Sequence, residues 1–433
     1  MEPSALYAYY LAHPLVSTDT RNIQPNCLFF ALKGAHFNGN EFAAEALANG
    51  ASYAIIDEPQ YRADERFLLV PDVLTALQEL ARHHRAQLRI PVVGITGTNG
   101  KTTTKELIHA VLSQQFRTYA TKGNLNNHIG VPLTILSIGP ETEIAVVEMG
   151  ANHPGEIAFL CTIAQPTHGL ITNVGKAHLE GFGGFEGVKR TKGELYDYLA
   201  EHQGTLFLQR DNPLLREMAE IRDIHRVVRY GFSSENDVHG RLSAANPLLE
   251  IQWSANPATL RYTVATHLTG AYNTENILAA ICVGLHFGVS PAAINNGIGH
   301  YVPTNNRSQL TKTEKNTVIC DYYNANASSM AAALDNLHML DAARKVAVLG
   351  DMFELGDESP AEHRHVVEQA RALHLDRIIF VGGAFYEHRF EGGEFYQTTD
   401  EAKAALIQRP VAGALVLLKA SRGMAFEQLL GFL

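Results

Sequence analysis

Cysteine, long apolar runs and positive charge are all scarce in this chain of 433 residues. Its four cysteines are scattered without a CxxC pair, so we expect buried free thiols in a reducing cytoplasm rather than disulfides or a cysteine-bound metal cluster. The strongest apolar run, Val411 to Leu418, has the length of a core strand and not of a membrane span. The N-terminus shows no basic stretch followed by an apolar one, so no secretion signal is expected.

The charge balance argues against two classes of partner. A formal net charge of −10 disfavours nucleic acid and anionic membranes, since both attract basic surfaces. It leaves room for a small anionic substrate in a local pocket. Apolar residues make up 46% and charged residues 18% of the chain, as in ordinary globular proteins, and the length predicts two to three domains. We therefore expect a cytoplasmic enzyme that acts as a monomer, without membrane insertion.

Residues 92–112 carry the most informative pattern. An apolar run leads into Thr-Gly-Thr-Asn-Gly-Lys-Thr and helical periodicity follows, which predicts a strand, a phosphate-binding loop and a helix. Lys101 would reach the outer phosphates of a nucleotide, and the Thr102 hydroxyl would bind Mg²⁺. The common form of this motif has glycine five places before Gly100, where this chain has Ile95. A glycine-rich turn with an incidental lysine is the alternative interpretation.

Two buried strands of one predicted sheet are followed by polar residues. Residues 144–150 form an apolar run with Glu148 near its end, where ligands of parallel sheets collect and carboxylates commonly bind Mg²⁺. An ordinary glutamate capping the next turn would look the same. His178 follows another such run, 169–174, and is either structural or a second group at this edge. Most of the lysines of residues 187–196 are most simply interpreted as a solvated basic face.

The two ends of the chain look like separate α/β units. Apolar runs at 27–32 and 53–56 predict strands, and polar residues on both sides of the first run form either a ligand-binding edge or solvated loops. In the middle of the chain, Asn273 and Asn276 begin an alanine-rich helix and would either cap it or contact an adenine edge. We predict further strands at 318–321, 346–349, 378–381 and 414–418, and domains over residues 1–82, 83–303 and 304–433.

The Thr-Gly-Thr-Asn-Gly-Lys-Thr form of the phosphate loop resembles that of the Mur ligase family, the ATP-dependent amide-bond-forming enzymes of peptidoglycan precursor synthesis. Folylpolyglutamate synthases share this loop, so it indicates a superfamily and not a substrate. Further segments extend the resemblance nearly end to end, at 123–127, 148–153, 177–183, 321–326 and 350–356. Tyr272 stands where the family often has His, and Ala420 where it usually has Gly.

The resemblance implies an α/β protein of three domains: a small N-terminal uridine-nucleotide domain, a central P-loop ATPase-like domain and a C-terminal Rossmann-like domain. It implies ATP and Mg²⁺ as cofactors, and UDP-N-acetylmuramoyl-tripeptide and D-alanyl-D-alanine as substrates that are joined through an acyl phosphate. Glu148 and His178 would bind a second Mg²⁺ with Lys192, which would be carbamylated by CO₂. Implied nucleotide contacts are Thr96, Gly97, Thr98, Asn99, Gly100, Lys101, Thr102, Thr103, Asn273, Asn276, Arg307 and Asp321. Implied substrate contacts are Thr18, Asp19, Thr20, Arg21 and Lys33 for the UDP end, Asn126 and His128 for the tripeptide, and Asn324, Asn326, Ser421 and Arg422 for the dipeptide.

Two other functions fit parts of this pattern. A P-loop ATPase or kinase outside the ligases would release a stable phosphorylated product and would need no amine. An inactive sugar-nucleotide binding protein would bind nucleotide without turnover, although the joint presence of Lys101, Glu148 and His178 argues against it. Diaminopimelate and lysine both fit as the third peptide residue.

Overall fold

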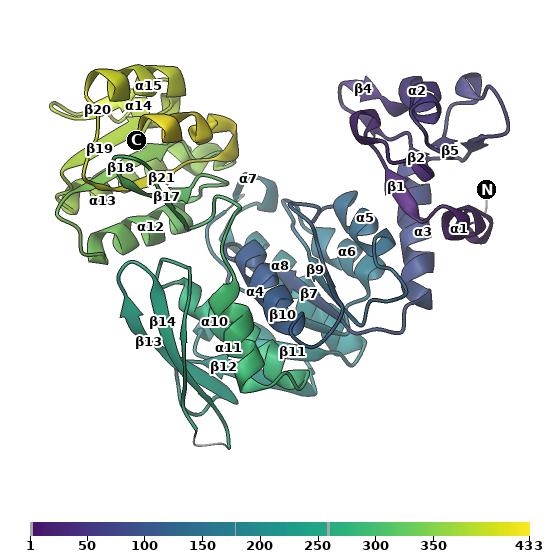
Figure 1. Cartoon of the computed structure of the whole chain (residues 1–433), viewed down its shortest axis with the longest axis horizontal. Helices are drawn as coiled ribbons and strands as arrows, with labels where there is room; N and C mark the ends of the chain where they lie inside the picture. The colour runs from purple at the N-terminus through teal and green to yellow at the C-terminus, as the bar shows by residue number, and fades with distance from the viewer. Residues whose placement is uncertain (1–2, 178, 258–259) are drawn as a thin grey trace.

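The chain folds into three α/β parts, each built on its own main sheet (Figure 1). The computed structural model describes residues 3–177, 179–257 and 260–433. His178, one of the predicted metal ligands, lies outside the described residues. Within these ranges no helix has both the length and the apolar character needed to cross a bilayer.

The N-terminal part is a four-stranded parallel sheet in the order β1-β2-β5-β6. Its last helix, α3, begins at an N-cap in which Asp72 accepts a hydrogen bond from the Thr75 N–H at 2.7 Å. Near the end of α3, the buried Arg85 donates to the carbonyls of Ala164 at 2.8 Å and Gln165 at 2.9 Å, which ties this helix to the middle part. The elements are α1 (Pro3–Ala12), β1 (Leu15–Ser17), β2 (Cys27–Phe30), β3 (Lys33–Gly34), β4 (Phe37–Asn38), α2 (Ala43–Ala48), β5 (Tyr53–Ile56), β6 (Phe67–Leu69) and α3 (Val73–Gln87).

The middle part is a nine-stranded sheet in the order β15-β14-β13-β12-β11-β10-β7-β9-β8, parallel from β8 to β13. Because side chains alternate between the faces of a strand, Val147 packs on the side of α5, α6 and α8, and Val146 on the side of α4, α10 and α11. The C-terminal ends of β7, β9 and β10 meet at one edge of the sheet. The strands are β7 (Val92–Thr96), β8 (Thr118–Ala120), β9 (Ile144–Glu148), β10 (His168–Ile171), β11 (Thr205–Gln209), β12 (Arg226–Gly231), β13 (Val238–Ala245), β14 (Leu249–Ala255) and β15 (Tyr262–Ala265). The helices are α4 (Lys101–Leu112), α5 (Gly130–Leu136), α6 (Glu156–Ala164), α7 (Leu179–Phe182), α8 (Phe185–Glu201), α9 (Pro213–Glu220), α10 (Asn273–His286) and α11 (Pro291–His300).

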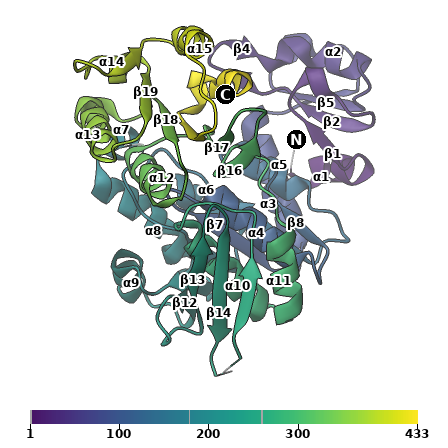
Figure 2. The same cartoon turned by 60° about the vertical axis from the view of Figure 1, so that its left-hand side comes forward.

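The C-terminal part is a six-stranded sheet in the order β16-β17-β21-β18-β19-β20, parallel except for β16. Helix α12 faces the middle part in both views (Figures 1 and 2). The elements are β16 (Gln309–Lys312), β17 (Thr317–Asp321), α12 (Ala327–Met339), β18 (Lys345–Gly350), α13 (Ser359–Ala372), β19 (Arg377–Val381), α14 (Gly383–Tyr386), β20 (Glu394–Tyr396), α15 (Thr399–Gln408) and β21 (Leu415–Lys419).

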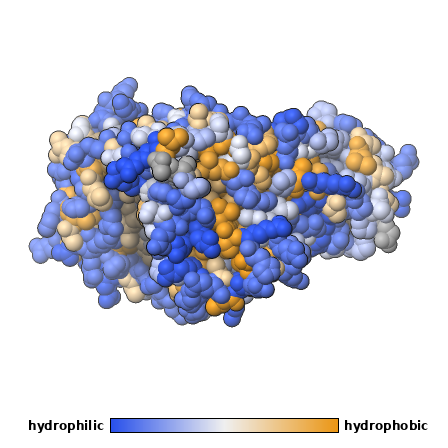
Figure 3. Space-filling model, turned by 90° about the horizontal axis from the view of Figure 1, so that it is seen from below, coloured by the Kyte–Doolittle hydropathy of each residue, from blue (hydrophilic) through white to orange (hydrophobic). Residues whose placement is uncertain are grey.

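Polar residues lie mainly on the surface and the cysteines lie in the interior, as the composition of the chain predicts. Seen from below, polar residues cover most of the molecule and apolar residues reach the surface in short strips (Figure 3). All four cysteines are buried and unpaired, as expected. The strands predicted in the last third are present as β17, β18, β19 and β21.

Candidate active site

A cavity of about 740 Å³ lies between the middle and C-terminal parts. One wall is the edge where β7, β9 and β10 end, and the other includes the end of β17 and the start of α12. Thr96 and Thr102 flank the phosphate loop outside the lining. The predicted site residues that line the cavity are Gly97, Thr98, Asn99, Gly100, Lys101, Thr103, Asn126, His128, Glu148, Lys192, Asn273, Asn276, Arg307, Asp321, Asn324 and Asn326.

The phosphate loop joins β7 to α4 through two glycines in the left-handed region. Gly97 has φ +141° and Gly100 has φ +78°. A Cβ at Gly97 would clash with Thr172 Oγ1, and one at Gly100 would lie 2.8 Å from Asn276 Oδ1. Both positions therefore require glycine, for conformation and for space.

Lys101 is the first residue of α4 and folds back over the loop. Its Nζ donates to the carbonyls of Gly97 at 2.8 Å and Thr98 at 3.0 Å. Burial lowers the pKa of Lys101 to about 8, an effect that the charge of Glu148 opposes and that of Arg307 reinforces. A phosphate would be a stronger acceptor than the two carbonyls and would stabilise the ammonium.

Glu148 ends β9 and presents one unpartnered carboxylate oxygen. Its Oε1 accepts from Thr102 Oγ1 at 3.3 Å and from Asn126 Nδ2 at 2.8 Å, whereas Oε2 is buried without a hydrogen-bond partner. Such an oxygen fits a divalent cation that prefers hard oxygen ligands, as Mg²⁺ does. Among the described residues no three or more His, Cys, Asp or Glu side chains gather into a metal cluster.

Lys192 is buried in α8, unlike the solvated lysine that its neighbours suggest. It is 2% exposed, with Nζ 3.4 Å from the Ala151 carbonyl and 5.2 Å from the centre of the Phe182 ring. Burial, together with the charge of Lys101, lowers the pKa of Lys192 to about 7. The alternative of a solvated face does not hold for Lys192, whereas Lys189 does pair with a surface carboxylate, Glu217, at 2.7 Å.

Asn273 and Asn276 join the start of α10 to the phosphate-loop helix. Asn273 Nδ2 donates to the Thr269 carbonyl at 2.7 Å, and its Oδ1 accepts from Asn276 Nδ2 at 2.8 Å. Asn276 Oδ1 accepts from Thr104 Oγ1 at 3.0 Å. Neither side chain caps α10. Instead, Asn276 links α10 to α4 at the cavity wall, and Asn273 holds the Asn276 amide in place.

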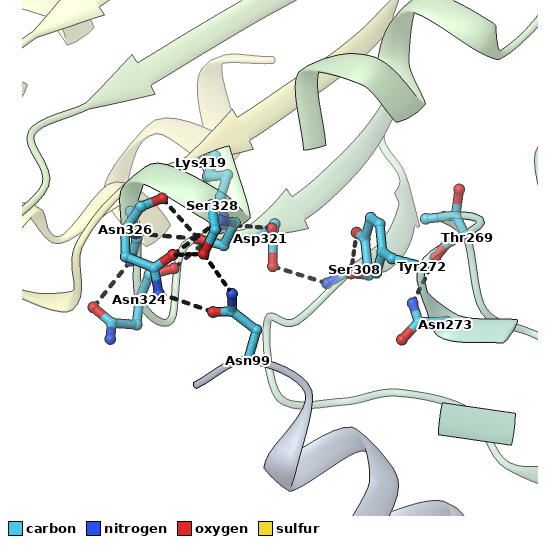
Figure 4. A network of polar contacts seen from close by, with 12 residues as sticks. Asn99, Thr269, Tyr272, Asn273, Ser308, Asp321, Asn324, Asn326, Ser328 and Lys419 are labelled. Atoms are coloured by element: carbon cyan, nitrogen blue, oxygen red, sulfur yellow. Dashed lines mark hydrogen bonds and ion pairs between the residues drawn. The ribbon is translucent and has the colours of Figure 1, made fainter. Parts of the chain in front are cut away.

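The C-terminal part brings Arg307 and Asp321 to the cavity. The guanidinium of Arg307 lies 3.9 Å from the centre of the Tyr323 ring, and its buried Nε has no hydrogen-bond partner. Asp321 accepts from Lys419 Nζ at 2.6 Å and from the Ser308 N–H at 3.1 Å (Figure 4). An unpartnered guanidinium nitrogen at the wall is suited to binding an anion.

The residues predicted to bind the UDP end lie at the C-terminal edge of the N-terminal sheet, outside the cavity lining: Thr18, Asp19, Thr20, Arg21 and Lys33. Hydrogen bonds from Arg21 lower the pKa of Asp19 to about 2. Lys33 pairs with Asp57 at 2.9 Å and with Glu58 at 3.0 Å. Their role toward UDP stays a prediction.

Two residues predicted near the dipeptide also lie outside the lining. Ser421 is buried, and its Oγ accepts from the Phe353 N–H at 3.0 Å. Arg422 lies 3.6 Å from Glu427 and its side chain is largely exposed. Their binding role stays a prediction as well.

Comparison with known proteins identifies the family. Three family models match in chain order: the Mur ligase family catalytic domain at residues 14–85, the Mur ligase middle domain at 95–284, and the Mur ligase glutamate ligase domain at 306–422. The chain is 37% identical to UDP-N-acetylmuramoyl-tripeptide--D-alanyl-D-alanine ligase of Escherichia coli, over 95% of this chain and 92% of that protein. The chain belongs to the Mur ligase family.

Other Mur ligases match over the same length. The protein of the same name from Bacillus subtilis is 35% identical, with 96% of this chain and 92% of that protein covered. The structure of MurF from Acinetobacter baumannii aligns with a TM-score of 0.84 and 33% identity, over 96% of this chain and 92% of that one. The structure of MurF from Thermotoga maritima in complex with ADP aligns with a TM-score of 0.85 and 27% identity, over 98% and 97% of the two chains. The expected family and its three-domain α/β fold class are thereby confirmed.

Three residues of this Mur ligase site were missed in the sequence. Tyr323 stacks on Arg307, Lys419 pairs with Asp321, and Ser328 reaches the phosphate loop. Tyr323 lies within a segment that carries the family resemblance, and Lys419 is next to Ala420, where the chain departs from it, but no local pattern tells which side chain each one contacts. Contacts between separate parts of a chain depend on how those parts dock.

Proposed function

We propose that this Mur ligase joins D-alanyl-D-alanine to UDP-N-acetylmuramoyl-tripeptide while ATP is converted to ADP and phosphate. The observation that carries the proposal is the cavity, which brings Lys101 and the unpartnered oxygen of Glu148 against Arg307 and Asp321 of the C-terminal part. Relatives that carry the name of this ligase match nearly the whole chain, which supports this choice of substrates within the family.

The reaction has two steps. A carboxylate oxygen of the tripeptide attacks the γ-phosphorus of ATP, and ADP leaves, which gives an acyl phosphate. The amine of the dipeptide then attacks the acyl carbon, phosphate departs with that oxygen, and the nitrogen loses a proton. The product is UDP-N-acetylmuramoyl-pentapeptide.

The residues at the cavity would act mainly by positioning and by charge. Because the carboxylate and ATP are both anionic, the site must offset their repulsion and hold the phosphoryl group in line. Lys101 and Arg307 would supply positive charge at the phosphates, and the N–H groups of the loop would hold them. One Mg²⁺ held at Thr102 and a second held at Glu148 would neutralise further phosphate charge.

Lys192 would act as a carbamate that helps to hold the second ion, with Glu148 and His178 as its other protein ligands. Carbamates form when a neutral amine attacks CO₂, and the lowered pKa of Lys192 leaves a large neutral fraction near pH 7. The carbamate would replace a positive charge that repels Mg²⁺ by oxygens that bind it. The burial of Lys192 in the cavity wall supports this role.

The remaining contacts belong to the same proposal. Asn273 and Asn276 would face adenine, Asp321 the ribose, and Asn126 and His128 the tripeptide. The UDP end would lie at the N-terminal sheet, with domains over residues 1–82, 83–303 and 304–433. The dipeptide would lie near Asn324, Asn326, Ser421 and Arg422.

The test is a product assay with purified protein, ATP, Mg²⁺, the UDP-tripeptide and D-alanyl-D-alanine. Mass spectrometry should find the UDP-pentapeptide, with one phosphate released per product, only when both substrates are present. Equal activity with free glutamate or diaminopimelate in place of the dipeptide would show that the chain catalyses the reaction of another member of the family. A stable phosphorylated product without any amine would make it a kinase.

A further inference from the structure

The side chain of Asn99 spans the boundary between the middle and C-terminal parts (Figure 4). Its Nδ2 donates to Ser328 Oγ at 2.9 Å, and its Oδ1 accepts from Asn326 Nδ2 at 2.8 Å. Both polar atoms of this amide are therefore bound by the C-terminal part, although Asn99 belongs to the phosphate loop of the middle part. We call these two hydrogen bonds the Asn99 contact.

The backbone of Asn99 is held by the middle part. Its N–H donates to Asn173 Oδ1 at 2.9 Å, and its carbonyl accepts from Thr172 Oγ1 at 2.6 Å and from Asn173 Nδ2 at 3.0 Å. The peptide group is thus fixed to the end of β10 while the side chain is fixed to the other part. A shift of the C-terminal part would therefore pull on the loop between its two glycines.

The partners of Asn99 lie at the N-terminus of α12. Asn326 is the N-cap, and its Oδ1 accepts from the Ser329 N–H at 2.9 Å and from Ser328 Oγ at 2.9 Å. Further along α12, Asn336 Nδ2 lies 3.4 Å from Thr269 Oγ1 of the middle part. The helix therefore contacts the middle part at two places along its length: at its N-terminus through the Asn99 contact, and at Asn336 through Thr269.

We propose that Asn99 is a positioning residue for phosphoryl transfer, whose amide transmits the docking of the C-terminal part to the phosphate loop. The inference rests on the proposed ligase function. Lys101 and Arg307 come from different parts, so they face one phosphate chain only when the parts are docked. Asparagine suits this task because its amide donates and accepts at once, so the contact holds the loop in one orientation.

The test is a double-substitution cycle of Asn99→Ala and Ser328→Ala, with kcat and KM for ATP measured during pentapeptide formation. Ser328→Ala removes one bond of the Asn99 contact, together with the bond from Ser328 Oγ to Asn326 Oδ1, and should lower kcat about 10-fold. Asn99→Ala removes both bonds of the contact and should lower kcat about 10–100-fold. KM for ATP should stay within about threefold, because the lost interaction aligns the loop rather than holding the nucleotide. The loss of kcat in the double variant should be clearly smaller than the product of the two single losses, since the Asn99–Ser328 bond is already absent in Asn99→Ala.

Asn246→Ala is the matched control. Asn246 Nδ2 joins the middle part to Asp341 Oδ2 at 3.0 Å, just beyond the far end of α12 and away from the phosphate loop, so kcat should stay within about threefold. Additive losses in the cycle, or an equal loss in Asn246→Ala, would overturn the proposal. So would a rise in KM that accounts for the whole loss, because Asn99 would then bind the nucleotide itself.

Failure of the ligase function would give a different result. If the wild-type chain forms no pentapeptide, the proposed function falls, and the Asn99 contact is then tested by small-angle X-ray scattering with ADP. Asn99→Ala and Ser328→Ala should each enlarge the radius of gyration of the nucleotide-bound protein. An unchanged radius of gyration in both variants would show that the Asn99 contact does not hold the two parts together.

Discussion

At the scale of single residues, the cavity gathers buried positive charge beside one buried carboxylate. Burial lowers the pKa of Lys101 to about 8, and Arg307 leaves a buried Nε without a partner. Buried cations without full counter-charge are costly, so a polyphosphate is a favourable occupant of this site. Glu148, with its free oxygen, would then need a cation of its own.

Lys101 is the first residue to test. Lys101→Ala should lower kcat by about 10²–10³, because one charge that stabilises the transferring phosphoryl group is lost. Far-ultraviolet circular dichroism should match the wild type, and Lys315→Ala, at an exposed lysine, should keep normal kcat. A nearly active Lys101→Ala enzyme would rule out the phosphate-loop interpretation.

Lys192 is tested by chemical rescue. Lys192→Ala should lower kcat by about 100-fold, and added acetate should restore part of it by placing a carboxylate in the vacated space. Lys189→Ala is the matched control, because that lysine pairs with Glu217 at the surface and should tolerate the change. Near-normal activity of Lys192→Ala in CO₂-depleted buffer would exclude a role for the carbamate.

At the scale of elements, apolar runs predicted the strands but not the orientation of every helix. The runs at 346–349 and 378–381 became β18 and β19, because buried parallel strands are continuously apolar. From its basic neighbours alone, a solvated position is the simplest interpretation of Lys192. Its spacing from Val188 and Leu195 places it on the buried face of α8, a helical signal that could have revealed its burial. The Asn99 contact left no such signal, since it depends on the docking of two parts.

The contact between β10 and α10 should make stability depend on pH. His168 Nε2 lies 3.1 Å from His286 Nε2, and burial, with the charges of His286 and Arg226, lowers the pKa of His168 from 6.5 to about 4. Between these two values the unfolded chain binds a proton at this position that the folded chain does not, so the free energy of unfolding falls as the pH falls.

His168→Gln removes this proton uptake. Between pH 7 and 4.5 the free energy of unfolding of the variant should fall by about 2 kcal/mol less than that of the wild type. Urea titration can follow it through the fluorescence of Trp253, the single tryptophan, which is buried in the middle part. An equal fall of the free energy of unfolding in the variant and the wild type would show that His168 does not cause the pH dependence.

At the scale of the whole molecule, the three parts divide the proposed work. The N-terminal sheet edge would hold the UDP end, and the tripeptide would extend toward the cavity. The C-terminal part is docked on the middle part through the Asn99 contact and through Lys176 and Glu362, which pair at 2.8 Å. The resemblance to the family predicted this division, whereas the docking contacts became visible only in the folded chain.

The central claim, ligation through an acyl phosphate, is tested most directly by oxygen transfer. The UDP-tripeptide would be labelled with ¹⁸O in the reacting carboxylate and converted with ATP and D-alanyl-D-alanine. Because that carboxylate attacks the γ-phosphorus, one ¹⁸O atom should appear in each phosphate released, matched by one UDP-pentapeptide. Unlabelled phosphate formed alongside pentapeptide, or ATP turnover without pentapeptide, would contradict the account.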